Sequence, residues 1–174
     1  MWSPGEGGRM IEKVVSIKLP VDEELMVVKN RIAPEGLGEG AKRICIVTGT
    51  HGDELEGQLV CFELARFLRA NMGHLKGIVD IYPALNPLGI DSITRGIPGF
   101  DLDMNRTFPG KRDGSMPEYV AAEIFDDIAG ADVCIDIHAS NIFLREIPQI
   151  RINELSAKEL VPLARYMNVV PDFL

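Results

Sequence analysis

Two histidines and a glutamate follow strand-like segments of this sequence, and they are residue types that bind metal ions. His51 and Glu54 stand three residues apart in a glycine-rich corner after the apolar run 44–47. His138 directly follows a second apolar run, 133–137. Catalytic zinc usually has three protein ligands of histidine and carboxylate type and one open position. Because ligand sites in α/β sheets lie outside the carboxyl ends of the strands, these three residues are predicted to share one metal ion.

The pair His51 and Glu54 is a weak signal by itself, because many surface helices contain this spacing by chance. In that alternative His51 is a loop histidine, and Glu54 is a carboxylate favoured at a helix N-terminus by the helix dipole. The position of His138 after a buried strand favours the metal site. Asp136 is predicted to point to the same side of its strand as His138 and to orient an imidazole. His74, in a polar stretch, is predicted to be a solvated loop histidine.

Arginines in the irregular stretch 86–113 are candidates for contact with a substrate. The guanidinium groups of Arg95 and Arg106 stay charged at every relevant pH and bind carboxylates through paired hydrogen bonds. An arginine beside a reacting carbonyl can also stabilise the negative charge that develops on its oxygen. In the alternative, these arginines lie at the surface and pair with nearby aspartates such as Asp101 and Asp103. The residues alone leave both interpretations open.

Composition and charge exclude several classes of partner. The formal net charge is −8 and no Lys/Arg-rich run occurs, which argues against binding to nucleic acid or to anionic membranes. No window reaches the ~18 apolar residues of a membrane span, and residues 1–8 contain no signal-peptide core. Cys45, Cys61 and Cys134 form no CxxC pair and are predicted to be buried free thiols. A cytoplasmic location is therefore predicted.

Strands that alternate with helices must position these residues, and this order predicts a layered α/β fold with a mixed sheet. The predicted strands cover residues 11–19, 24–32, 43–48, 78–84 and 132–138. The predicted helices cover residues 54–70, 115–128 and 156–167, and the last two begin with capping boxes. Residues 34–40 and 86–113 are predicted loops, and 142–152 an extended or hairpin segment. Residues 1–10 are expected to be a flexible leader, with one domain over 11–174.

Several spaced motifs together resemble the succinylglutamate desuccinylase/aspartoacylase family of zinc carboxypeptidase-like hydrolases. The resemblance covers about residues 43–152, and its motifs occur in the family's order. They are His51-Gly52-Asp53-Glu54, Asn86-Pro87, Arg95, Asp103-Met104-Asn105-Arg106-Thr107-Phe108-Pro109-Gly110 and Asp136-Ile137-His138. The resemblance implies a three-layer α/β/α fold with a mixed, mostly parallel sheet.

The same resemblance implies roles for individual residues. It implies a Zn²⁺ ion held by His51, Glu54 and His138, carbonyl polarisation by Arg95, and a substrate carboxylate bound by Asn105 and Arg106. Met104 stands where the family's Asp-Leu-Asn-Arg motif usually has leucine, which is a volume-conserving change. The implied reaction is zinc-dependent hydrolysis of an amide bond in a small, carboxylate-bearing N-acyl amino acid.

One feature of the family does not appear after His138. The family's general base is a glutamate on a later strand, whereas Glu146, Glu154 and Glu159 lie outside such a strand context. The expectation is a catalytic domain incomplete at its C-terminus, weak or inactive as this short chain, with an exposed sheet edge that favours homo-oligomers. A zinc metallocarboxypeptidase and a catalytically inert metal-binding remnant are the alternatives.

Overall fold

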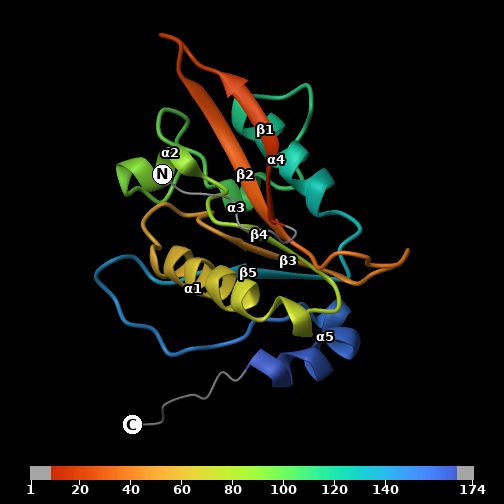
Figure 1. Ribbon diagram of the computed structural model, residues 1–174. Coiled ribbons are helices and arrows are strands. Elements are labelled where there is room, and N and C mark those ends of the chain that lie inside the picture. Colours follow the sequence, from red (N-terminus) through yellow and green to blue (C-terminus); the bar gives the residue numbers. More distant parts are fainter. Residues whose placement is uncertain (1–8, 168–174) are drawn as a thin grey trace. The chain divides into compact units, whose positions relative to one another are not determined.

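The computed structural model describes residues 9–167, which divide into two units, 9–142 and 143–167. The first unit is built on a five-stranded sheet with the strand order β1-β2-β4-β3-β5 (Figure 1). The strands are β1 (Arg9–Lys18), β2 (Glu24–Ile32), β3 (Arg43–Thr48), β4 (Ile78–Tyr82) and β5 (Val133–Ile137). Strand β2 is antiparallel to both of its neighbours, whereas β3 is parallel to β4 and β5. Four of the five strands therefore run in one direction, and the prediction of a mixed, mostly parallel sheet is confirmed.

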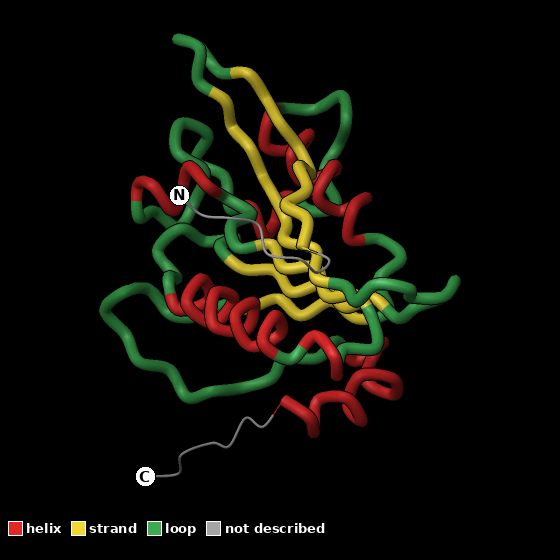
Figure 2. Tube along the Cα trace, viewed as in Figure 1, coloured by secondary structure: helices red, strands yellow, loops and turns green. Residues whose placement is uncertain are grey.

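Helices cover both faces of this sheet, as the red and yellow segments of Figure 2 show. The helices of the first unit are α1 (Glu56–Ala70), the 3₁₀ helix η1 (Met72–His74), α2 (Pro87–Ser92), α3 (Met104–Thr107) and α4 (Met116–Ile128). Helix α1 lies on one face and α4 on the other, which is the three-layer arrangement expected. The second unit contains η2 (Glu154–Ser156), α5 (Ala157–Ala164) and η3 (Arg165–Met167). Every helix within residues 9–167 is too short or too polar to cross a lipid bilayer.

Strand β3 shows why both faces of the sheet need cover. Its residues alternate between two apolar clusters, because successive side chains of a strand point to opposite faces. Cys45 and Val47 pack in the cluster that contains Ala121 of α4, whereas Ile46 packs in the cluster that contains Ala65 of α1. A strand that is covered on both faces has a nearly continuous apolar sequence. The apolar run 44–47 was the basis for predicting a buried strand here, and it lies within β3.

The stretch 86–113, predicted to be a loop, contains two short helices. Asn86 is the N-cap of α2, and its side chain accepts a hydrogen bond from the Gly89 N–H. Asp103 is the N-cap of α3 and accepts one from the Asn105 N–H. Helices of six and four residues are too short to build an apolar stripe, so hydrophobic periodicity does not reveal them.

Three other predictions need correction or fall outside the structure. Residues 142–152 form a turn and irregular chain and no hairpin. The leader predicted over 1–10 overlaps β1, which begins at Arg9, and its residues 1–8 lie outside the described part of the chain. Cys45 and Cys61 are buried as predicted, but Cys134 is exposed. The reason is that β5 lies at the edge of the sheet formed by residues 9–167, and its own residues alternate between half-buried and exposed.

A buried group of charged side chains joins the sheet to α4. Asp80 of β4 is fully buried and accepts hydrogen bonds from Arg31 Nε at 2.9 Å and Arg43 Nε at 2.8 Å. Lys29 Nζ lies 2.7 Å from Asp127 Oδ1 of α4. Burial alone would raise the pKa of Asp80, but the hydrogen bonds from the two arginines outweigh it and hold that pKa below its usual value. The carboxylate is therefore ionised in the folded protein and compensates the charges of two half-buried arginines.

Replacement of this carboxylate tests the stabilising role of the charged group. We expect Asp80→Asn to lower the free energy of unfolding at pH 7 by about 2–3 kcal/mol, less than for a fully buried ion pair, because Arg31 and Arg43 are half-buried and lose the carboxylate that they share. The contribution of the carboxylate is complete above the ordinary aspartate pKa of about 3.9 and is lost as the pH falls through the lower folded-state pKa. In urea unfolding between pH 7 and pH 3, the free energies of unfolding of the unmodified and Asp80→Asn proteins should therefore approach each other as the pH falls.

The matched control for this experiment is Asp113→Asn, which changes an exposed aspartate. Its unfolding free energy should follow that of the unmodified protein at every pH. A difference between the Asp80→Asn protein and the unmodified protein that does not change with pH would contradict the assignment of this effect to the carboxylate charge.

Candidate metal centre

His51 and Glu54 lie in the tight corner between the end of β3 and the start of α1, and both are buried. Gly49 begins the corner with a φ of +68°, in the left-handed region that favours glycine. Gly52 brings the corner against α2, because a Cβ at this position would lie 1.9 Å from the carbonyl carbon of Gly89. Helix α1 begins at Glu56, two residues later than predicted. Glu54 therefore belongs to the corner rather than to the first helical turn.

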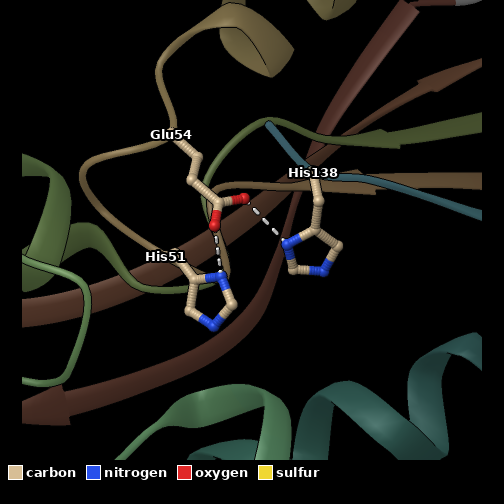
Figure 3. Close-up of side chains that lie close together, drawn as sticks. All are labelled: His51, Glu54 and His138. Atoms are coloured by element: carbon tan, nitrogen blue, oxygen red, sulfur yellow. Dashed lines mark hydrogen bonds and ion pairs between the residues drawn. The ribbon is translucent and has the colours of Figure 1, made fainter. Parts of the chain in front are cut away.

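The carboxylate of Glu54 lies between the imidazole rings of His51 and His138 (Figure 3). Glu54 Oε1 is 2.7 Å from His51 Nδ1, and Glu54 Oε2 is 2.9 Å from His138 Nδ1. One ligand atom from each of the three residues lies within 4.8 Å of the others. In the described part of the chain, this is the one such group of three that could hold a metal ion. The structure thus brings together the three residues that the sequence singled out.

The outer nitrogen of each imidazole contacts a second carboxylate. His138 Nε2 is 3.0 Å from Asp136 Oδ2, which is the contact predicted from strand alternation. His51 Nε2 is 2.9 Å from Asp103 Oδ1. From the sequence, Asp103 was a possible arginine partner and part of a family motif, and its contact with His51, 52 residues away, was not predicted. Each aspartate turns its ring so that Nδ1 faces Glu54, the orientation in which both Nδ1 atoms can bind one ion.

The electrostatics of these groups favour a cation at the site. Bonds to Asp136 and Glu54 outweigh burial and raise the pKa of His138 to about 9. Burial would raise the pKa of Glu54, but the Ala139 N–H, 2.9 Å from Oε2, and the histidines hold that pKa below its usual value. Each imidazole has a carboxylate oxygen at both of its nitrogens, and an ionised carboxylate only accepts hydrogen bonds. A neutral imidazole has one N–H, so the lone pair of its other nitrogen would face a carboxylate. A second proton on the ring, or a metal ion at one of its nitrogens, removes this repulsion.

The charges around the site match a divalent ion. With neutral imidazoles, the carboxylates of Glu54, Asp103 and Asp136 and the guanidinium of Arg95 leave two negative charges. Two imidazole nitrogens and a carboxylate oxygen are also the ligand types of catalytic zinc sites. Donor chemistry and charge therefore fit Zn²⁺.

Arg95 lies beside the candidate ligands. Its guanidinium contacts Glu54 Oε1 at 3.4 Å and Asp103 Oδ2 at 3.2 Å, and its side chain is 56% exposed. The sequence left open whether Arg95 contacts a substrate or pairs with a nearby aspartate. It does pair with Asp103, and because Asp103 also contacts His51, this pairing places Arg95 at the candidate site. Asn105 and Arg106 are exposed residues of α3, linked to the site by the Asn105 N–H, which donates to Asp103 Oδ1. The roles of their side chains stay predictions.

Comparison with known proteins shows the family to which the sequence is similar. Residues 40–170 match the family described as succinylglutamate desuccinylase/aspartoacylase catalytic domain. The chain is 34% identical over 113 residues to an N-alpha-acetyl-L-2,4-diaminobutyric acid deacetylase of Halomonas elongata, an alignment of 64% of this chain and 32% of the deacetylase. The chain thus spans about a third of the length of this relative.

Solved structures show the same fold. An aspartoacylase family protein from Mesorhizobium loti superimposes with a TM-score of 0.76 at 23% identity, over 97% of this chain and 53% of that protein. A metallo-carboxypeptidase from Burkholderia cenocepacia superimposes with a TM-score of 0.63 at 18% identity, over 92% of this chain and 46% of that protein. At these identities the similarity shows a shared fold.

Removal of the outer carboxylates tests their role in orienting the imidazoles. We expect Asp103→Ser and Asp136→Ala each to lower zinc affinity by about 10–100-fold. Serine retains an N-cap hydroxyl for α3 but is too short to reach His51. The loss should be larger for Asp103, because water can replace Asp136, whose side chain is 40% exposed. Competition with a chromophoric chelator measures the affinity, and equal losses in an Asp113→Ala control would refute this role.

Proposed function

Because the chain belongs to the succinylglutamate desuccinylase/aspartoacylase family, we propose that it carries the metal centre of a zinc-dependent hydrolase acting on N-acyl amino acids. The observation that supports this most is the placement of His51 Nδ1 and His138 Nδ1 on the two oxygens of Glu54. These three residues are the proposed zinc ligands. The bond cleaved is the amide between the acyl group and the amino acid, a C–N bond outside peptides.

The residues around the ligands have separate tasks in this proposal. Asp103 and Asp136 hold the imidazoles so that their Nδ1 atoms stay directed at the ion. The half-exposed guanidinium of Arg95 can reach the carbonyl oxygen of the scissile amide and stabilise the charge that develops there. Zinc, when bound, supplies Lewis-acid polarisation and lowers the pKa of a water molecule.

Substrate binding falls to Asn105 and Arg106, which we propose to hold the carboxylate of the amino acid. A planar guanidinium binds a carboxylate through two parallel hydrogen bonds, which fixes orientation as well as charge. Such a local cation matters in a chain with a formal net charge of −8, because the protein as a whole repels an acidic substrate. The deacetylase from Halomonas elongata suggests an acetylated diamino acid as one substrate to test.

Turnover by the 174-residue chain alone is proposed to be weak. The glutamates after His138 are Glu146, Glu154 and Glu159, and none of them lies on a strand of the structure. A general base typically contributes 10²–10⁴-fold to a rate. We therefore expect this chain to hydrolyse its substrates about 10²-fold or more slowly than the deacetylase from Halomonas elongata, measured under the same conditions.

A panel of substrates tests the proposed activity. Zinc-loaded chain should release acid from one or more of Nα-acetyl-L-2,4-diaminobutyrate, N-succinyl-L-glutamate and N-acetyl-L-aspartate, and a chelator should abolish this. His138→Ala should abolish both zinc binding and turnover, because it removes one of three ligands. His74→Ala, which changes an exposed histidine of η1, should leave both unchanged.

Other outcomes would select the alternatives. Cleavage of C-terminal residues from peptides, with no release of acyl groups, would identify a metallocarboxypeptidase. Zinc binding without turnover of any substrate would identify an inert metal-binding remnant. A rate equal to that of the deacetylase from Halomonas elongata would contradict the expected weak turnover, and absence of zinc binding would reject the ligand assignment.

The cellular setting and the partners are also proposals. We propose a cytoplasmic protein that binds a small carboxylate-bearing amide, binds neither nucleic acid nor membranes, and self-associates through the open edge of β5. In the described part of the chain β5 pairs only with β3, so its other edge carries unpaired backbone groups. Sedimentation velocity at high protein concentration should show dimers or larger species, and a monomer alone would contradict self-association.

A further inference from the structure

Thr48, the last residue of β3, lies where the two segments that carry the candidate ligands begin. It is fully buried and lies three residues before His51. Its Oγ1 donates a hydrogen bond of 3.2 Å to the carbonyl oxygen of Ile137, the residue before His138. Gly57, in the first turn of α1, packs against the same hydroxyl, because a Cβ on Gly57 would lie 1.8 Å from Thr48 Oγ1. The corner with Glu54 connects directly to that turn.

The position of this hydroxyl at the end of the sheet gives its hydrogen bond particular importance. Thr48 and Ile137 are the last residues of β3 and β5 that pair in register. The Thr48 hydroxyl therefore adds a link between the two strands at the point where their regular pairing stops and the ligand-bearing segments begin. On its other side, the Thr48 carbonyl accepts a hydrogen bond of 3.0 Å from the Leu85 N–H, which follows β4. Thr48 is thus held from three directions.

We propose that Thr48 is a positioning residue of the metal centre. Its hydroxyl sets the separation between the corner that carries His51 and Glu54 and the strand end that carries His138. Van der Waals contact with Gly57 holds the start of α1 in the same place. A shift of His138 away from Glu54 would lengthen the 2.9 Å approach of His138 Nδ1 to Oε2 and separate the ligand atoms. The role in metal binding rests on the proposed function, whereas the role in holding His138 does not.

Two substitutions separate the hydroxyl from the packing of the side chain. Thr48→Val has nearly the same shape and no donor, and it should lower zinc affinity about tenfold. Thr48→Ser retains the donor and loses only a methyl group, and its zinc affinity should stay within about twofold of that of the unmodified chain. A purely structural role for Thr48 would lower the thermal stability of both variants and leave zinc affinity unchanged in both.

A second measurement needs no metal. In the zinc-free chain, amide hydrogen exchange followed by NMR reports on the Ala139 N–H, which donates to Glu54 Oε2. Thr48→Val should accelerate exchange at Ala139 more than at Ile135 in the middle of β5, whereas Thr48→Ser should leave the ratio of the two rates unchanged. Equal acceleration at both amides would overturn the positioning role.

The two measurements also separate this inference from the proposed function. If the unmodified chain binds no zinc, the proposed function fails, and the exchange rates at Ala139 still decide the role of Thr48. If the unmodified chain binds zinc and Thr48→Val binds it equally well, the positioning role fails and the proposed function stands.

Discussion

The rest of the candidate site depends on the contacts of the Glu54 carboxylate with two imidazole rings. This carboxylate accepts contacts from His51 Nδ1, His138 Nδ1 and the Ala139 N–H, so it joins the corner after β3 to the end of β5. A buried carboxylate is costly unless it is paired and hydrogen-bonded. Because each of these rings has a carboxylate oxygen at both of its nitrogens, a second proton on the ring or a metal ion at one of its nitrogens stabilises the arrangement. The site is in this sense preorganised for a cation.

The sheet makes this carboxylate possible by the direction of its strands. Because β3 and β5 are parallel, the segments that carry His51 and His138 leave the sheet at the same end. At that end the Thr48 hydroxyl forms a further hydrogen bond between the two strands. The buried charged group around Asp80 joins the sheet to α4, whose residues pack with Cys45 and Val47 of β3. Sites built on such rigid elements hold their ligands more precisely than sites on free loops. The irregular stretch after β4 then adds Arg95 and Asp103 through short, capped helices.

Charge compensation links the metal centre to the kind of substrate proposed for it. Asp103, which orients His51, and the candidate ligand Glu54 also pair with Arg95, so the guanidinium lies beside the candidate ligands although the chain as a whole is acidic. A cation and a divalent metal in one place can receive an acidic amide that the remaining surface would repel. The family to which the chain belongs contains deacylases, and the shared fold extends to a metallo-carboxypeptidase. The geometry of the candidate metal centre can therefore be understood apart from the identity of the acyl group.

The sequence alone was sufficient to predict the layered fold and to identify the three candidate ligands. Apolar runs mark β3 and β5, and His51 and His138 follow them, so local patterns reported both the strands and the residues at their ends. Asp136 could also be predicted, because strand alternation is a local property.

Contacts between distant segments were decided only by the tertiary structure. The approach of Asp103 to His51 and the hydroxyl bridge from Thr48 to Ile137 join residues 52 and 89 positions apart. The exposure of Cys134 depends on β5 lying at the edge of the sheet, which the composition of β5 does not reveal. Periodicity and residue type describe a segment and its immediate neighbours, whereas the order of strands and the packing of loops on them determine which side chains meet.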